Sequence, residues 1–307
     1  MMIVFLVITL LLLGTTCSDK PLYGIGNVTG TTYSDKPLYG INYGPRRTLN
    51  SCPSFDIITS DLVLLSNLTN RIKTFGLIDS GTGMASVSCP FGELVLKAAD
   101  VVKMKADDSE LKRLVSTHPN LFENVDSVVV GSETLFRGEE TQQTLAERVT
   151  KVRNFLHSNK LARITVTAAE INLPFYGDVL IAAVDYLLVN VYPYWEGRAS
   201  ATAPQLQITE TRDLASRGQG KPLVLGEVGW PTGGDAFRDA LPSLSNLEQY
   251  CTTWVRMAKT NNMGHFFFEA FDESWKPAEH GGVEQHWGLY YSNRTVKSMQ
   301  CITAVSC

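Results

Sequence analysis

Two glutamates, each at the end of an apolar run and each close to a glycine, are the residues best placed to do chemistry. Glu133 follows the β-type run at residues 128–132, and Glu227 follows the run at 223–226. A carboxylate is costly to desolvate, so one that follows several buried β-formers is expected to face a cleft. Hydrolysis of a glycosidic bond requires such a pair of carboxylates at one site. Either glutamate alone could instead open a surface loop, since strands often end in polar residues.

The composition is that of a soluble globular protein. The chain has 307 residues, of which 44% are hydrophobic and 19% charged, which suits one barrel-sized domain or two smaller ones. With a net charge of −4, the chain lacks the excess of basic residues that is typical of nucleic-acid-binding proteins, so no nucleic-acid partner is expected.

The N-terminus predicts secretion. The apolar run at 2–13 is too short to span a bilayer comfortably and is followed by small residues, so we expect a signal peptide at 1–17. The protein is then extracellular or in a cell wall, without a stable membrane anchor. Because a basic n-region is missing, an uncleaved anchor is the alternative. Residues 15–25 recur at 31–41 with one difference, and we expect 18–36 to be a disordered, duplicated leader ahead of a domain at 37–307.

Sequons and cysteines are consistent with that compartment. Sequons begin at Asn27, Asn67 and Asn293, which supports glycosylation without proving it. The six cysteines are Cys17, Cys52, Cys89, Cys251, Cys301 and Cys307. Loss of Cys17 with the signal leaves at least one free or intermolecular thiol. Cys301 and Cys307 are close enough in sequence to pair, but the connectivity stays open.

No motif predicts a metal or a cofactor. Neither Cys-x-x-Cys nor a Cys/His spacing occurs, and we expect His280 and His286 to be surface residues. The glycines at 24–30 are not flanked by a strand and a helix, so they do not make a dinucleotide fingerprint.

Strand-like and helical patterns alternate along the chain. Two helices are signalled by capping boxes, Thr144 with Glu147 and Ser245 with Glu248. About eight strand–helix units in ~250 residues predict a parallel (β/α)8 TIM barrel, with a doubly wound open sheet as the alternative. Glu133 and Glu227 then end strands four and seven, which face one another across the barrel. The strand candidates are 38–43, 71–78, 125–132, 163–168, 185–192, 222–227 and 264–270.

The third strand is hard to find. Helical patterns at 91–99 and 107–115 leave only residues 101–105 for it, and this segment is short and carries two lysines. We therefore expect a short or defective third strand, which puts closure of the barrel in doubt.

The chain resembles glycoside hydrolase family 17, the β-1,3-glucanases and β-1,3-glucan transglycosidases, and in particular its fungal and oomycete cell-wall branch. The resemblance runs from Tyr39 to about Tyr291. It rests on residues 39–45 (YGINYGP), 130–133 (VGSE), 190–195 (NVYPYW), 226–231 (GEVGWP), 267–276 (FFEAFDESWK) and 287–289 (WGL).

The resemblance implies roles for individual residues. Glu133 matches the family's acid/base and Glu227 its nucleophile, with Tyr192 as a donor that keeps Glu227 ionised. Glu273 and Lys276 resemble a charged pair near the acid/base, unless they form a surface ion pair. The residues expected to bind substrate are Tyr43, Ser132, Asn190, Tyr192, Tyr194, Trp195, Phe271, Glu273, Trp275 and Lys276.

Two side chains depart from the family pattern. Ser132 stands where many members have asparagine, and Phe75 stands where they often have tyrosine on strand two. The hydrogen bond that the asparagine would make to the sugar 2-OH is then weaker or water-mediated.

The resemblance implies a retaining hydrolase of internal bonds in β-1,3-glucan, active as a monomer. A β-1,3-glucan transglycosidase is the first alternative, since both reactions share a glycosyl-enzyme on Glu227. A catalytically weak glucan-binding wall protein is the second, and it depends on a compromised third strand.

Overall fold

The computed structural model describes residues 36–76, 89, 95, 102–105, 108–171 and 175–303. The expected signal peptide, almost all of the duplicated leader, the Asn27 sequon, Cys17, Cys307 and most of the helical pattern at 91–99 lie outside these residues. In the described part of the chain no helix is both long and apolar enough to cross a membrane.

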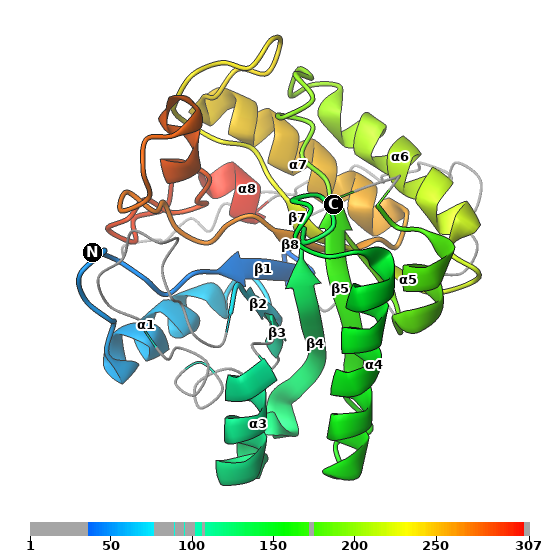
Figure 1. The fold of residues 1–307 in the computed structure, drawn as a ribbon. Coiled ribbons are helices and arrows are strands. Elements are labelled where there is room, and N and C mark those ends of the chain that lie inside the picture. The colour runs from blue at the N-terminus through cyan, green and yellow to red at the C-terminus, as the bar shows by residue number, and fades with distance from the viewer. Residues whose placement is uncertain are drawn as a thin grey trace, which may run out of the picture.

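Eight parallel strands form a closed barrel in sequence order, which confirms the predicted (β/α)8 fold (Figure 1). Strand β8 pairs with β1 and closes the sheet. The strands are β1 Gly40–Tyr43, β2 Ile72–Thr74, β3 Val102–Lys105, β4 Val125–Ser132, β5 Thr165–Ile171, β6 Leu187–Asn190, β7 Leu223–Val228 and β8 Gly264–Phe267.

Helices surround this barrel and cover the outer face of its strands (Figure 1). The α-helices are α1 Phe55–Leu65, α3 Asp108–Thr117, α4 Gln142–Ser158, α5 Asp178–Ala183, α6 Ala203–Arg217, α7 Leu244–Thr260 and α8 Met299–Thr303. Two 3₁₀ helices, η1 Pro119–Asn124 and η2 His280–Gln285, lie between them. Strands enclosed in this way are buried on both faces, which is why β6 and β7 read as continuous apolar runs.

Strand β3 closes the barrel despite its composition. It is short, as predicted, and it pairs in parallel with both β2 and β4. The expectation of a defective strand was wrong, because backbone pairing needs N–H and C=O groups in register and does not depend on apolar side chains.

Several strand ends differ from the prediction, among them those of β5 and β8. Strand β5 continues past residue 168 to Ile171, and the fully buried Glu170 belongs to it. Strand β8 ends at Phe267 rather than at 270 because the chain then bonds outside the sheet: the amide of Glu269 donates to the carbonyl of Trp287 at 3.1 Å.

The two predicted helix caps were also wrong by two or three residues. Helix α4 is capped by Thr141, with Thr144 as its reciprocal partner, and helix α7 is capped by Ser243. Several Ser and Thr residues near each start could serve as the cap, and packing of the helix on the barrel selects among them.

Two disulfides tie segments that are distant in sequence. Cys52 bonds Cys89, and Cys251 of α7 bonds Cys301 of α8. Cys301 therefore pairs with a partner fifty residues away rather than with its neighbour Cys307.

Candidate active site

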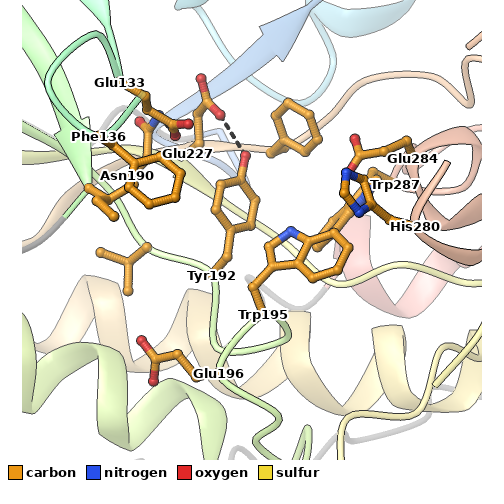
Figure 2. A pocket seen from close by; sticks show the side chains of 13 residues that line it. Glu133, Phe136, Asn190, Tyr192, Trp195, Glu196, Glu227, His280, Glu284 and Trp287 are labelled. Atoms are coloured by element: carbon orange, nitrogen blue, oxygen red, sulfur yellow. Dashed lines mark hydrogen bonds between the residues drawn. The ribbon is translucent and has the colours of Figure 1, made fainter. Parts of the chain in front are cut away.

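A cavity of about 670 Å³ opens where strands β4 to β7 end. Both glutamates singled out in the sequence line it, together with five aromatic side chains (Figure 2). The lining residues are Glu133, Phe136, Ile171, Asn190, Val191, Tyr192, Trp195, Glu196, Glu227, Phe268, His280, Glu284 and Trp287.

Glu133 leaves strand β4 in an unusual backbone conformation. Gly131 has a φ of 79° and Glu133 a φ of 58°, and a left-handed conformation is uncommon for a residue that carries a side chain. The amide of Glu133 donates to the carbonyl of Ala169 on β5 at 2.8 Å, which holds this turn against the neighbouring strand. The result is a carboxyl group that points into the cavity rather than continuing the strand (Figure 2).

The Glu133 carboxyl is placed to hold a proton. Burial raises its pKa above the ordinary value, and the negative charge of Glu227 raises it further. A hydrogen bond from Asn190 Nδ2 to Oε1, 2.7 Å long, acts in the opposite direction. Since Asn190 comes from β6, it also fixes the direction in which the carboxyl points.

Glu227 is buried and both of its oxygens accept hydrogen bonds. Lys73 Nζ lies 2.7 Å from Oε1. The Tyr192 hydroxyl donates to Oε2 at 2.5 Å (Figure 2). Burial and the charge of Glu227 raise the pKa of Tyr192 well above its ordinary value, so the phenol keeps its proton and remains a donor. An ammonium and a phenol on its two oxygens are partners for an ionised carboxylate.

Lys73 contacts Glu227 and was not among the site residues predicted from the sequence. It lies on β2 with only 3% of its surface exposed, and Nζ also donates to Asn42 Oδ1 at 2.9 Å. Asn42 in turn donates to the carbonyls of Gly226, Phe266 and Phe267. A lysine inside a predicted strand of a closed barrel was the available signal, because its charge needs a partner wherever it is buried.

Replacing Lys73 with methionine is expected to lower kcat/KM by about 10- to 100-fold. A charge-assisted hydrogen bond contributes about 1.5–3 kcal/mol, and each 1.4 kcal/mol or so is a factor of ten. Lys73→Arg, which keeps the charge, should lose less, and methionine at the exposed Lys151 of α4 should change nothing. Steady-state kinetics would contradict the role of Lys73 if its methionine variant matched that of Lys151.

The coupling between the two carboxyls can be measured directly. In a Glu227→Gln variant the pKa of Glu133 should fall, because one cause of its elevation is removed while burial remains. A carboxyl that acts as an acid must be protonated, so an activity that uses Glu133 in this way should be lost as pH rises through its elevated pKa. Titration of the Glu133 carboxyl by ¹³C NMR tests the shift, and an unchanged pKa would mean that the two groups do not interact.

A second group of residues lies at the other side of the cavity, around Trp195 and Trp287 (Figure 2). Glu284 contributes a further carboxyl there, and burial raises its pKa. His280, predicted as a plain surface residue, is exposed but lines the cavity, with its ring 5.6 Å from that of Trp195. His280 lies in η2, and a polar loop sequence does not predict that this segment reaches the cavity.

The predicted pair Glu273 and Lys276 exists, with Glu273 buried and Lys276 half-buried, so it is not a surface ion pair. The two groups are 2.7 Å apart, and Lys276 also contacts Glu269 at 3.3 Å and Glu284 at 4.0 Å. Burial by itself would lower the pKa of Lys276, but the surrounding carboxylates raise it above its ordinary value. Lys276 Nζ lies 5.3 Å from the ring of Phe268, so this cluster supports the Phe268 and Glu284 side of the cavity.

The structure brings five of the predicted residues together on the cavity: Glu133, Asn190, Tyr192, Trp195 and Glu227. Tyr43 is instead fully buried, with its hydroxyl bonded to Asp61 at 3.1 Å. Aromatic residues at strand ends also fill the space behind the site, and sequence alone does not distinguish the two positions. The predicted residues that do not line the cavity are Tyr43, Ser132, Tyr194, Phe271, Glu273, Trp275 and Lys276.

No group of three or more His, Cys, Asp or Glu side chains that could hold a metal ion occurs among the described residues.

Known proteins resemble this chain in sequence and in fold. Residues 40–288 match the BtgE/BtgC glycoside hydrolase domain. A glucan 1,3-beta-glucosidase of Schizosaccharomyces pombe is 29% identical over 268 residues, which cover 83% of each chain.

Two solved structures from Rhizomucor miehei have the same fold. One is a glycoside hydrolase family 17 β-1,3-glucanosyltransferase, with a TM-score of 0.73 and 29% identity over 87% of this chain and 97% of that chain. The other is an active-site mutant of a β-1,3-glucanosyltransferase in complex with laminaritriose, with a TM-score of 0.75 and 27% identity over 88% of this chain and 99% of that chain. The family match extends over most of the chain and the site contains a pair of carboxyl groups. The chain therefore belongs to glycoside hydrolase family 17 and is a glycosidase.

Proposed function

We propose that the protein cleaves β-1,3-glucan with retention of configuration, using Glu227 as the nucleophile and Glu133 as the acid/base. The observation that carries this proposal is the unlike environment of the two carboxyls in one cavity. Glu227 accepts from an ammonium and a phenol, whereas burial and a neighbouring charge raise the pKa of Glu133. Groups whose environments differ in this way are suited to the two roles that retention requires.

The substrate follows from the relatives and from the shape of the site. The related proteins are named for 1,3-linked glucan, and one was solved with laminaritriose. Aromatic residues such as Tyr192, Trp195 and Trp287 line the cavity, where their faces can stack on pyranose rings.

Product analysis tests both the activity and its outcome. The purified protein should release shorter sugars from a reduced β-1,3-linked oligosaccharide, and ¹H NMR of the first product should show the β anomer. Products longer than the substrate would identify transfer to a sugar hydroxyl, the second candidate, which the Rhizomucor miehei relatives favour. An α anomer as the first product would exclude the retaining mechanism.

A glucan-binding protein without catalysis is the less favoured reading. It depended on a compromised third strand, and β3 pairs on both sides in a closed barrel. Binding of β-1,3-glucan with no release of sugar, unchanged in a Glu227→Ala variant, would support it.

We also propose that the protein is secreted as a monomer, acts at the cell wall and carries a glycan at Asn293. The Asn293 side chain is exposed, and both the amide and the hydroxyl of Thr295 bond its Oδ1, at 3.0 and 2.6 Å. In the other described sequon Thr69 is buried, with its hydroxyl bonded to the carbonyl of Tyr39. Peptide mass spectrometry after enzymatic glycan release should detect a glycosylated Asn293 and an unglycosylated Asn67. The reverse pattern would contradict this proposal.

A further inference from the structure

Glu170 is a buried carboxylate next to the site that neither the sequence reading nor the proposed reaction uses. It lies on β5 with none of its surface exposed, although a carboxylate is among the costliest groups to bury. Its Oε1 accepts from the amide of Leu135 at 2.9 Å and from the Thr134 hydroxyl at 3.4 Å. Its Oε2 accepts from the amide of Phe136 at 3.4 Å.

These partners all belong to the turn that follows Glu133. The turn closes on itself through the amide of Arg137, which donates to the carbonyl of Glu133 at 3.0 Å. Within such a turn the amides of Leu135 and Phe136 have no carbonyl partner in the preceding strand, and buried amides need one. The Glu170 carboxylate supplies it from the adjacent strand.

The backbone of β5 holds the other side of the same turn. The carbonyl of Ala169, the residue before Glu170, accepts from the amide of Glu133 at 2.8 Å. Two consecutive residues of β5 therefore fix the chain before and after the Glu133 side chain. Glu133 itself has a φ of 58°, a conformation that persists in a non-glycine residue where its surroundings impose it.

We propose that Glu170 is the positioning residue for the acid/base: it holds the turn at residues 134–136 so that the Glu133 carboxyl faces the cavity. This inference rests on the function proposed above. It gives a buried carboxylate a role in the reaction without contact with the substrate.

The effect of displacing the Glu133 carboxyl depends on the leaving group of the substrate. Protonation of the glycosidic oxygen needs Glu133 within hydrogen-bond reach, so a shifted carboxyl impairs substrates with poor leaving groups most. A dinitrophenolate leaves without a proton, and the first step with such a substrate does not need the acid. A loss of general stability would impair both substrates alike.

The test compares Glu170→Gln with the unmodified protein on two substrates, a β-1,3-glucan oligosaccharide and 2,4-dinitrophenyl β-laminaribioside. Glutamine keeps the shape but replaces one acceptor oxygen with an NH₂ group, which faces donors of the turn. We expect kcat on the oligosaccharide to fall about 10²-fold, the loss that follows a misplacement of about 1 Å, with KM unchanged. The rate of the initial burst of dinitrophenolate release should fall much less. Azide should restore the steady-state turnover of the dinitrophenyl substrate by the variant, with formation of the β-glycosyl azide.

Thr167→Val is the matched control. Thr167 lies on the same strand, is fully buried, and bonds the carbonyl of Tyr186 at 2.6 Å, so its loss weakens the barrel away from Glu133. It should lower the melting temperature while leaving the ratio of the two activities unchanged. If Glu170→Gln behaved in the same way, or if a folded Glu170→Ala variant kept full activity on the oligosaccharide, the positioning role would be overturned. If the unmodified protein released neither sugar nor dinitrophenolate, the proposed function itself would fail.

Discussion

Replacing Glu227 with alanine is expected to lower kcat on β-1,3-glucan by roughly 10⁵-fold, the scale of loss when a covalent nucleophile is removed. Without the carboxylate no glycosyl-enzyme forms, and the remaining groups of the cavity cannot replace it. Lys73 and Tyr192 would lose their common partner, so some loss of stability is also expected.

Azide identifies the role of the lost group. In the Glu227→Ala variant azide can enter the space of the carboxylate and attack the anomeric carbon, while Glu133 protonates the departing oxygen. With an activated β-glycoside the product should be the α-glycosyl azide, with inverted configuration. The control is Glu147→Gln on the exposed face of α4, which should leave kcat unchanged. Retention of substantial activity by the Glu227 variant would show that another group attacks.

Replacing Glu133 with alanine should lower kcat on the same glucan by about 10²- to 10⁴-fold, the contribution of general acid–base catalysis. The loss should depend on the leaving group, because a dinitrophenolate needs no proton to depart. Pre-steady-state kinetics should then show a burst of dinitrophenolate followed by slow turnover, since no base activates water in the second step.

The stereochemistry with azide separates the two glutamates. In the Glu133→Ala variant azide attacks the glycosyl-enzyme on Glu227, so the product should be the β-glycosyl azide. An α product from this variant, or an equal loss on both substrates, would mean that the two roles have been assigned to the wrong residues.

The site shows where sequence reasoning works and where it stops. Glu133 and Glu227 could be found from the sequence because a carboxylate at the end of a buried run is a local pattern, and strand order places both at one end of a barrel. Lys73 was missed because its partner lies far away in the chain: Lys73 bonds Glu227, which is 154 residues away. Tyr43 was expected in the cavity and lies in the core because the direction of an aromatic side chain at a strand end depends on packing.

The same distinction holds for the fold. The barrel, most of its strands and the helices α3, α4 and α7 followed from the alternation of apolar periods, which each segment carries by itself. The exact helix caps, the extension of β5 through the buried Glu170 to Ile171 and the closure at β3 depended on neighbouring segments. The pairing of Cys251 with Cys301 depended on how α7 and α8 pack.

The sequence by itself determined the class of fold, the family pattern and the two carboxyl groups, because these are written in local periodicity and in short motifs. Only the tertiary structure decided how each carboxyl differs from the other. Asn190, Lys73, Tyr192 and Glu170 come from three different strands and a loop, and their contacts exist only once the barrel is closed. A pKa and the direction of a side chain depend on distance through space, and a linear sequence does not contain that distance.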